Sequence, residues 1–363
     1  MIALVALCMT AWAGTVQVHV MDVGQGDAIL IEAPEGKRVL IDASTGKAGV
    51  ADKLKAKGIS SLNLVVATHP HADHIGGMAE VLKNIKVGRY MDNTMTHTTL
   101  TYARTMAAVE KKGVGYVGAI QGRSFNLGKE VKLTVLHPRS TLLKGTRSDL
   151  NSNSVVIRMD HKNNCFLFTG DAEEPTERDL VNRGLEECDV LKVAHHGSGH
   201  STTAGFLRAV KPKFAAISAG AGNRYDHPDD AALNRLRSAE VDVHRTDTDG
   251  TITFTSDGNS IKVSTERDGG DPFVGVSVSD DPGEETAASV VGNKININTA
   301  DATALDALPG VGPSRATAIL DYRKKNGPFK TCDSILEVYG IGPKTVENIR
   351  PICTTETNEK ATP

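Results

Sequence analysis

Thr68-His69-Pro70-His71-Ala72-Asp73-His74-Ile75-Gly76-Gly77 places three histidines and one aspartate within six residues. The apolar run from Leu62 to Ala67 before it is typical of a buried strand, and a helix is expected from Met78 to Ile85. The cluster should therefore lie on a loop that leaves a strand, where a rigid scaffold directs several side chains to one point. Imidazole together with carboxylate suits zinc, manganese or iron. The alternative is a polar surface loop rich in histidine, which four ligand-type residues at this spacing argue against.

Two later segments place ligand-type residues in the same way. Asp171 follows the apolar run from Cys165 to Thr169, and His195 follows the run from Val190 to Ala194. Because both runs read as strands, all three segments are expected to converge at one sheet edge.

The first cluster resembles the His-x-His-x-Asp-His signature of the metallo-β-lactamase fold superfamily. Three further stretches resemble the hydrolase domain of the ComEC family, the DNA-uptake channel proteins of bacterial competence: Asp22-Val23-Gly24-Gln25-Gly26-Asp27-Ala28, Phe168-Thr169-Gly170-Asp171 and Leu191-Lys192-Val193-Ala194-His195-His196-Gly197-Ser198. The resemblance covers roughly Val16 to Val263 and implies an αββα sandwich. The pattern of short strands and helices alone predicts only an α/β or α+β fold.

The resemblance also implies two divalent metal ions, zinc or manganese, and six ligands. His69 and His71 would bind the first ion, Asp73, His74 and His195 the second, and Asp171 would bridge them. Asp73 would also handle protons as a catalytic carboxylate. Two adjacent metal ions hold a hydroxide at neutral pH and clamp the attacking and leaving oxygens of a phosphodiester.

One part of the superfamily pattern is missing. The third histidine of the first metal site should precede the bridging aspartate by about twenty residues, where this chain has Asn151-Ser152-Asn153-Ser154. Manganese then becomes as plausible as zinc. His137 is a substitute ligand, although a strand-end histidine without a partner is more often structural.

Six residues are candidates for handling the substrate. His196 and Ser198 would contact the scissile phosphate, or alternatively only shape their loop. The stretch Asn223-Arg224-Tyr225-Asp226-His227-Pro228 resembles another part of the ComEC pattern. In it, His227 would act as a general acid and Arg224 would hold phosphate. Asn153 and Asn223 complete the predicted substrate-binding set.

The N-terminal stretch is apolar and short. Residues 1–13 end in Ala11-Trp12-Ala13, which is typical of a signal-peptidase site, so we expect a signal peptide and export to the periplasm or the extracellular space. A buried first strand or helix is the alternative. No other run has the length and apolarity of a transmembrane helix, so we expect no stable membrane insertion.

Four cysteines remain after the leader. Cys165 and Cys188 each begin a predicted strand, and Cys332 and Cys353 bracket the last helical segment. In an oxidising compartment we expect these two pairs to form disulfides. Four buried free thiols are the alternative.

The chain of 363 residues is long enough for two or three domains. Its net charge of −3 lacks the positive excess that is typical of a chain that binds nucleic acid over its whole surface. Residues 15–264 form the predicted hydrolase domain, 293–353 a second domain and 354–363 a disordered tail. Between the domains, Glu266 to Glu285 holds seven acidic residues against one arginine, which predicts an extended acidic linker over 265–292.

The second domain contains a repeat, Leu308-Pro309-Gly310-Val311-Gly312-Pro313 and Val338-Tyr339-Gly340-Ile341-Gly342-Pro343. It resembles the tandem helix-hairpin-helix domain of the ComEA family, a small all-α module. A Gly-x-Gly turn directs backbone amides outward at a helix N-terminus, which forms a phosphate cradle. The residues expected to bind DNA, without reading its sequence, are Gly310, Val311, Gly312, Arg315, Gly340, Ile341, Gly342 and Lys344. A protein-interaction module is the alternative.

Together these patterns predict an exported nuclease whose second domain holds DNA near a dinuclear metal site. Two other functions remain open. One is a metallohydrolase of a lactone, a β-lactam or a phosphorylated small molecule. The other is a non-catalytic DNA-binding protein whose metal site is structural. The oligomeric state has no signal in the sequence.

Overall fold

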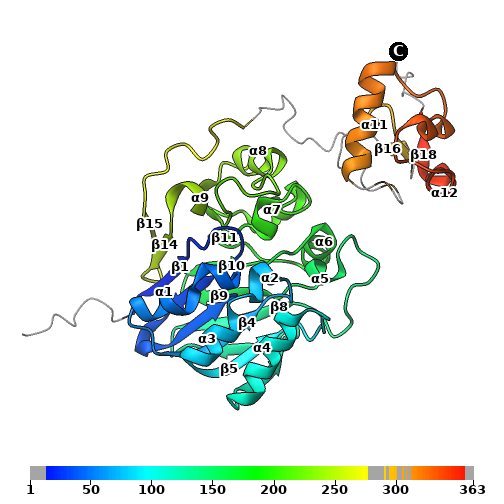
Figure 1. Cartoon of the computed structure of the whole chain (residues 1–363). Coiled ribbons are helices and arrows are strands. Elements are labelled where there is room, and N and C mark those ends of the chain that lie inside the picture. Colours follow the sequence, from blue (N-terminus) through cyan, green and yellow to red (C-terminus); the bar gives the residue numbers. More distant parts are fainter. Residues whose placement is uncertain are drawn as a thin grey trace, which may run out of the picture. The chain divides into compact units, whose positions relative to one another are not determined.

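The computed structural model describes residues 14–276, 290–291, 294–300, 305, 308, 311 and 313–355. They belong to two compact units, divided after Pro282, and each unit is described by itself (Figure 1). The predicted signal peptide over 1–13, residues 356–363 of the predicted tail, and Gly310 and Gly312 lie outside the described residues. No helix in the described ranges is long and apolar enough to cross a membrane.

The first unit contains two mixed sheets. The eight-stranded sheet has the order β15 (Ile261–Thr265), β14 (Ile252–Ser256), β1 (Val16–Val20), β2 (Ile29–Glu32), β3 (Arg38–Ile41), β4 (Ser61–Ala67), β5 (Lys86–Asp92) and β6 (Gly115–Gly118). The seven-stranded sheet has the order β13 (Asp242–Arg245), β12 (Phe214–Ile217), β11 (Val190–Lys192), β10 (Asn164–Phe168), β9 (Val156–His161), β8 (Val131–His137) and β7 (Ser124–Asn126). Strands β3 to β6 are parallel in the first sheet, as are β10 to β13 in the second.

Helices cover the outer face of each sheet (Figure 1). The longer helices are α1 (Val50–Ala56), α3 (Met78–Asn84), α4 (Leu100–Lys111), α6 (Glu174–Asn182), α7 (Ala204–Val210) and α8 (Asp230–Ser238). Single turns form α2 (Ala72–Ile75), α5 (Asp149–Ser152), α9 (Thr246–Asp249), η1 (Pro34–Gly36), η2 (Gly46–Ala48) and η3 (Ala194–Gly197).

Side chains along each strand alternate between an inner core, which lies between the two sheets, and an outer core, which lies between a sheet and its helices. On β4, Leu64 and Val66 join the core between the sheets, whereas Val65 packs toward the helices. On β10, Phe166 and Phe168 face inward, and Leu167 joins the outer core under α6 and α7. Because side chains alternate along a strand, a sheet buried on both faces needs such continuous apolar runs. The architecture is the predicted αββα sandwich.

The part of the acidic stretch nearest the first unit is not an extended linker. Phe273 and Val276 pack against the outer core, and the guanidinium of Arg237 lies 4.6 Å from the Phe273 ring centroid. Arg267 forms an ion pair with Asp22 at 3.2 Å. The predicted start of the linker at residue 265 is therefore too early, because two apolar side chains within the acidic stretch have a core to join. Residues 277–289 lie outside the described part.

The second unit combines helices with a small sheet. Its elements are β16 (Val290–Val291), β17 (Lys294–Asn296), α11 (Pro313–Asn326), η4 (Cys332–Glu337), α12 (Pro343–Ile349), η5 (Arg350–Ile352) and β18 (Cys353–Thr354). Strand β17 pairs with β16 and β18, so the expected all-α module also carries three short strands. Leu308, Ile319, Ile335 and Ile349 belong to one apolar core, so the two repeats pack against each other in a single hydrophobic core.

Both expected cysteine pairs are bonded in the structure. Cys165 and Cys188 connect the starts of the neighbouring strands β10 and β11, with 4.9 Å between their Cα atoms. Cys332 and Cys353 connect η4 to β18, with 6.0 Å between their Cα atoms. Each bond therefore fastens two segments that are distant in sequence.

Candidate metal centre

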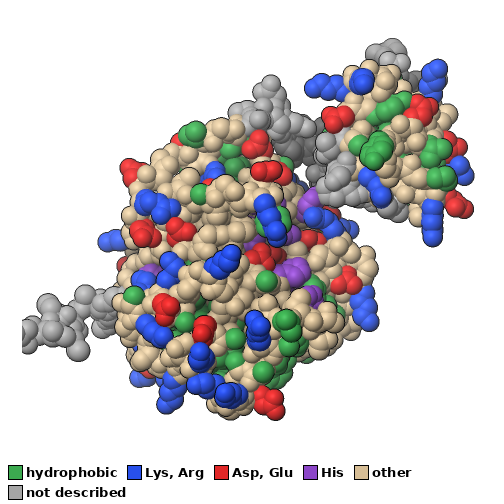
Figure 2. All heavy atoms as spheres, in the orientation of Figure 1, with side chains coloured by type: hydrophobic (Ala, Val, Ile, Leu, Met, Phe, Trp, Pro, Cys, Tyr) green, Lys and Arg blue, Asp and Glu red, His purple; other side chains and the backbone are tan. Residues whose placement is uncertain are grey.

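The three segments that carry ligand-type residues do converge. The loop after β4 carries His69, His71, Asp73 and His74, and the turns after β10 and β11 supply Asp171, His195 and His196. The backbone joins these loops, since Thr68 O accepts from Val155 N at 2.9 Å and Gly170 O accepts from His195 N at 3.0 Å. Figure 2 shows histidine side chains gathered on one face of this unit.

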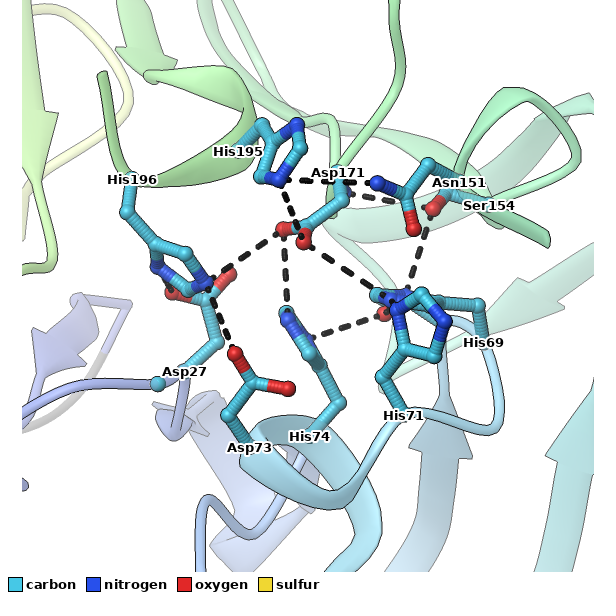
Figure 3. Close-up of polar contacts among 12 residues, drawn as sticks. Asp27, His69, His71, Asp73, His74, Asn151, Ser154, Asp171, His195 and His196 are labelled. Carbon is cyan, nitrogen blue, oxygen red and sulfur yellow. Dashed lines mark hydrogen bonds and ion pairs between the residues drawn. The ribbon is translucent and has the colours of Figure 1, made fainter. Parts of the chain in front are cut away.

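Asp171 lies at the middle of the centre, between two pairs of histidines (Figure 3). Its Oδ1 lies 3.2 Å from His74 Nε2 and 3.6 Å from His196 Nε2. Its Oδ2 lies 3.7 Å from both His69 Nε2 and His195 Nε2. One carboxylate thus presents a different oxygen to each pair, which is the arrangement that a bridging ligand requires.

His196, rather than His195, lies with Asp73 and His74. Ligand atoms of Asp73, His74 and His196 fall within 4.8 Å of one another, as do those of His69, His74 and Asp171. Both η3 histidines have left-handed backbone, with φ of 49° and 55°, so their rings point to different sides of Asp171. The predicted placement of His195 in the second site therefore differs from the structure.

Asp27 and Lys192 lie behind His196 and were missed by the sequence analysis. Asp27 Oδ1 lies 3.4 Å from His196 Nδ1, and Asp27 Oδ2 accepts from Lys192 Nζ at 2.9 Å. Both side chains are about 1% exposed. His196 Nδ1 also lies 2.9 Å from Ser218 O. A charged residue inside the apolar run of β11 was the available signal, because a buried lysine requires a partner.

Asp42 orients the first histidine loop. Its carboxylate accepts from Thr68 N at 2.8 Å and from Thr68 Oγ1 at 2.7 Å, and its Oδ2 lies 2.8 Å from His74 Nδ1. A carboxylate on the far ring nitrogen fixes the orientation of a histidine ligand and raises its basicity. His74 therefore presents Nε2 to Asp171.

Asn151 and Ser154 occupy the side of the centre where the third histidine is missing. Ser154 Oγ lies 3.3 Å from His69 Nδ1, and Asn151 Nδ2 lies 3.5 Å from His195 Nε2. Glu173 holds His195 from the other side, with Oε1 at 3.5 Å from His195 Nδ1. His195 Nε2 and His69 Nε2 both face Asp171 Oδ2. This side of the centre therefore has a second nitrogen that could bind a metal ion.

The protonation of the centre follows from its buried carboxylates. Burial opposes the charged form of His196, yet Asp171 and Asp27 raise its pKa to about 10. Burial likewise opposes the charge on His74, whereas Asp171 and Asp42 raise its pKa well above the usual value. Burial lowers the pKa of His195 to about 4, and it places the pKa of His69 well below the usual range.

The residues of the centre fit divalent cations. Within the described ranges, His74 Nε2, His196 Nε2 and Asp171 Oδ1 are buried and have no hydrogen-bond partner. Buried polar atoms without a partner are costly, and these three face one another. A cation between them would satisfy all three, and its charge would replace the protons that the histidines otherwise hold.

Some predicted residues have structural contacts instead. Asn153 is fully buried, and its amide bonds to Leu143 N, Leu143 O and Asp149 O, so it is not available to a substrate. Ser198 is buried within its own turn. His71 lies with Nδ1 at 2.9 Å from His69 Nε2 and belongs to none of the ligand clusters in the described part. His137 lies 3.9 Å from Asp179 and outside these clusters.

The loop from Gly220 to Pro228 reaches the edge of the centre. The ring centroid of His227 lies 5.8 Å from that of His195, and Arg224 is exposed beside Tyr225. Asn223 does not face the centre freely, because its amide bonds to Gly220 O, Tyr225 N and both backbone groups of His227. Its predicted substrate contact is replaced by a role in shaping the loop.

In the second unit, the hairpin residues divide between core and surface. Val311 and Ile341 are buried, so only their backbone can contact a ligand. Gly340 has φ of 89°, and Gly342 caps α12, which places the turn at a helix start. Lys344 lies in the first turn of α12, and Arg315 is exposed on α11.

Comparisons with known proteins agree with this geometry. Residues 21–221 match the family described as the metallo-beta-lactamase superfamily, and residues 290–354 match the helix-hairpin-helix motif. The chain is 32% identical over 258 residues to ComE operon protein 3 of Bacillus subtilis, covering 66% of this chain and 33% of that protein. It is 30% identical over 241 residues to competence protein ComA of Neisseria gonorrhoeae, covering 65% and 32%.

A shorter relative also matches. The chain is 29% identical over 188 residues to ComE operon protein 1 of Bacillus subtilis, covering 51% of this chain and 85% of that protein. The chain spans about a third of the length of the two longer relatives. With the sandwich fold, the clustered histidines and the family match in agreement, this chain belongs to the metallo-beta-lactamase superfamily.

Proposed function

We propose that this protein is an exported, metal-dependent nuclease that hydrolyses DNA phosphodiester bonds, and that its second unit binds DNA without reading sequence. The observation that carries the proposal is Asp171, whose two oxygens each face a separate pair of histidines. A bridging carboxylate supports a dinuclear site, and the helix-hairpin-helix match in the same chain supports DNA as the substrate. The likeness to competence protein ComA of Neisseria gonorrhoeae supports a role in competence.

The bound metal ions, zinc or manganese, would supply a hydroxide and stabilise the charge that develops on the phosphate. The predicted ligands His69, His71, Asp73, His74, Asp171 and His195, together with His196, would hold them. Burial opposes the charge on Asp73, yet His196, whose Nε2 lies 3.6 Å from Asp73 Oδ2, and His74 hold the pKa of Asp73 low, so this carboxylate stays anionic and suits a metal ligand. Lys192 and Asp27 would hold His196 in place.

His227 would give a proton to the leaving oxygen. Burial and the nearby His196 lower its pKa, so its ring is neutral before the substrate arrives. A phosphate placed next to the ring would raise that pKa, because an anion favours the protonated form. Protonation would then be coupled to substrate binding.

Export is part of the proposal and is supported by the disulfides. The bonds Cys165–Cys188 and Cys332–Cys353 require an oxidising environment. We also propose the domain organisation of a leader over 1–13, a hydrolase unit and a DNA-binding unit.

Cleavage of single-stranded and duplex DNA with manganese, zinc or chelator tests the proposal, with the Asp73→Ala variant alongside. We expect cleavage that requires both metal and Asp73. Metal binding without cleavage of any DNA would reject the nuclease and favour either another metallohydrolase or a structural metal site. His244→Ala, on β13 and outside the ligand clusters of the described part, is the matched control and should cleave normally.

A further inference from the structure

Tyr225 is an exposed aromatic ring connected to the metal centre. Its ring centroid lies 5.9 Å from that of His227, with an interplanar angle of 23°, and His227 lies 5.8 Å from His195. The Tyr225 side chain is 47% exposed, although burial of an aromatic ring is energetically favourable. A row of rings therefore runs from the histidine beside Asp171 out to solvent.

Arg224 places a positive charge on the same ring. The centre of its guanidinium lies 4.8 Å from the Tyr225 centroid, and its Nη2 donates to Tyr225 Oη at 2.5 Å. Arg224 is itself exposed. An aromatic face next to an exposed cation matches the two parts of a nucleotide, its base and its phosphate.

The loop that carries this pair is held in shape. Asn223 bonds to the backbone of Gly220, Tyr225 and His227, and Gly220 N donates to Gln25 Oε1 at 3.1 Å. A Cβ atom on Gly220 would lie 2.6 Å from Gln25 N, so the two loops touch through their backbones. Preorganisation of this kind reduces the entropy lost when a ligand stacks on the ring.

We propose that Tyr225 stacks on an unpaired nucleobase next to the scissile phosphodiester and that Arg224 holds the phosphate of the same nucleotide. This inference rests on the proposed nuclease function and names its substrate class as single-stranded or frayed DNA. In a duplex the bases are stacked inside, so only an unpaired nucleotide can offer its face to an aromatic ring. Every base has such a face, so the contact tolerates any sequence.

Steady-state cleavage of one oligonucleotide, single-stranded and annealed to its complement, tests this contact. We expect Tyr225→Leu to raise KM for the single strand roughly 5- to 100-fold while kcat and the KM for the duplex stay near wild type. Tyr225→Phe keeps the ring but loses the hydrogen bond that Arg224 donates, so its KM for the single strand should rise less than that of Tyr225→Leu. An abasic residue beside the scissile bond should raise KM for the wild type and leave the Leu variant unaffected.

Tryptophan fluorescence measures the stacking contact independently of DNA cleavage. In a Tyr225→Trp protein that lacks the proposed leader 1–13, and with it Trp12, the introduced tryptophan is the single one and should be quenched by oligothymidylate in chelator, whereas neither blunt duplex nor an abasic oligomer should quench it. Quenching without cleavage by the wild type would keep the stacking contact and reject the nuclease. Metal-dependent cleavage with no quenching and an unchanged KM in Tyr225→Leu would overturn the stacking contact and keep the nuclease.

Discussion

Lys192 Nζ lies 2.9 Å from Asp27 Oδ2 inside the first unit, where both side chains are about 1% exposed. Breaking a buried pair on one side leaves an uncompensated charge, which costs about 3–5 kcal/mol. We therefore expect Lys192→Met to lower the free energy of unfolding in urea by about that amount. The same variant should weaken metal binding by the pair Asp73 and His196, because Asp27 also contacts His196.

The matched control is Lys213→Met. Lys213 pairs with Asp189 at 2.8 Å but is 73% exposed, so its loss should change the free energy of unfolding by less than about 1 kcal/mol. A Lys192→Met/Asp27→Leu double variant removes both charges and should recover much of the lost stability. Equal effects of the two lysine variants would show that the buried pair is not the source of the stability.

His196→Ala and His195→Ala should differ in metal content. Because His196 lies with Asp73 and His74, its removal should reduce the stoichiometry from two ions to one after dialysis. His195 lies at the opposite oxygen of Asp171, so its removal should spare the ion held by Asp73 and His74. Elemental analysis of both variants measures this, with His244→Ala as the control. Loss of that ion in His195→Ala alone would reverse the assignment.

The fold was largely predictable, and the details of the centre were not. Continuous apolar runs before His69, Asp171 and His195 mark strands, and strands that end at one edge bring their following residues together. Which of two adjacent histidines faces Asp73 depends on left-handed backbone at both, which no periodicity reveals. Asn153 and Asn223 illustrate the same limit, since an amide that contacts a ligand and one that shapes a loop have the same sequence signal.

Stability at low pH should depend on His137. Burial, with Asp179 opposing and Arg183 assisting, lowers its pKa to about 4, whereas the unfolded chain has a value near 6.5. A lowered folded pKa gives a contribution that is present above about pH 6.5 and is lost as pH falls toward 4. Between pH 7.5 and 4.5, the wild type should lose about 2 kcal/mol more than His137→Gln in urea unfolding. Parallel pH profiles for the two proteins would contradict this.

The two disulfides should respond differently to a reductant. Cys165 and Cys188 are both buried within the outer core, whereas Cys332 is only partly buried. Dithiothreitol should therefore reduce Cys332–Cys353 first in native protein, as read by alkylation and mass spectrometry, because exchange requires access to a sulfur atom. The Cys332→Ser/Cys353→Ser variant opens a loop of 21 residues and should destabilise the second unit by about 3 kcal/mol.

If the hairpins bind DNA, this loss should also reduce DNA affinity at 37 °C and leave metal content unchanged, because the bond lies in the unit without the metal centre. The matched Cys165→Ser/Cys188→Ser variant should show the reverse, with the first unit destabilised and the DNA affinity of the hairpins retained. Four alkylated thiols in native protein before any reductant is added would show that neither bond forms, and the support that the disulfides give to export would then be lost.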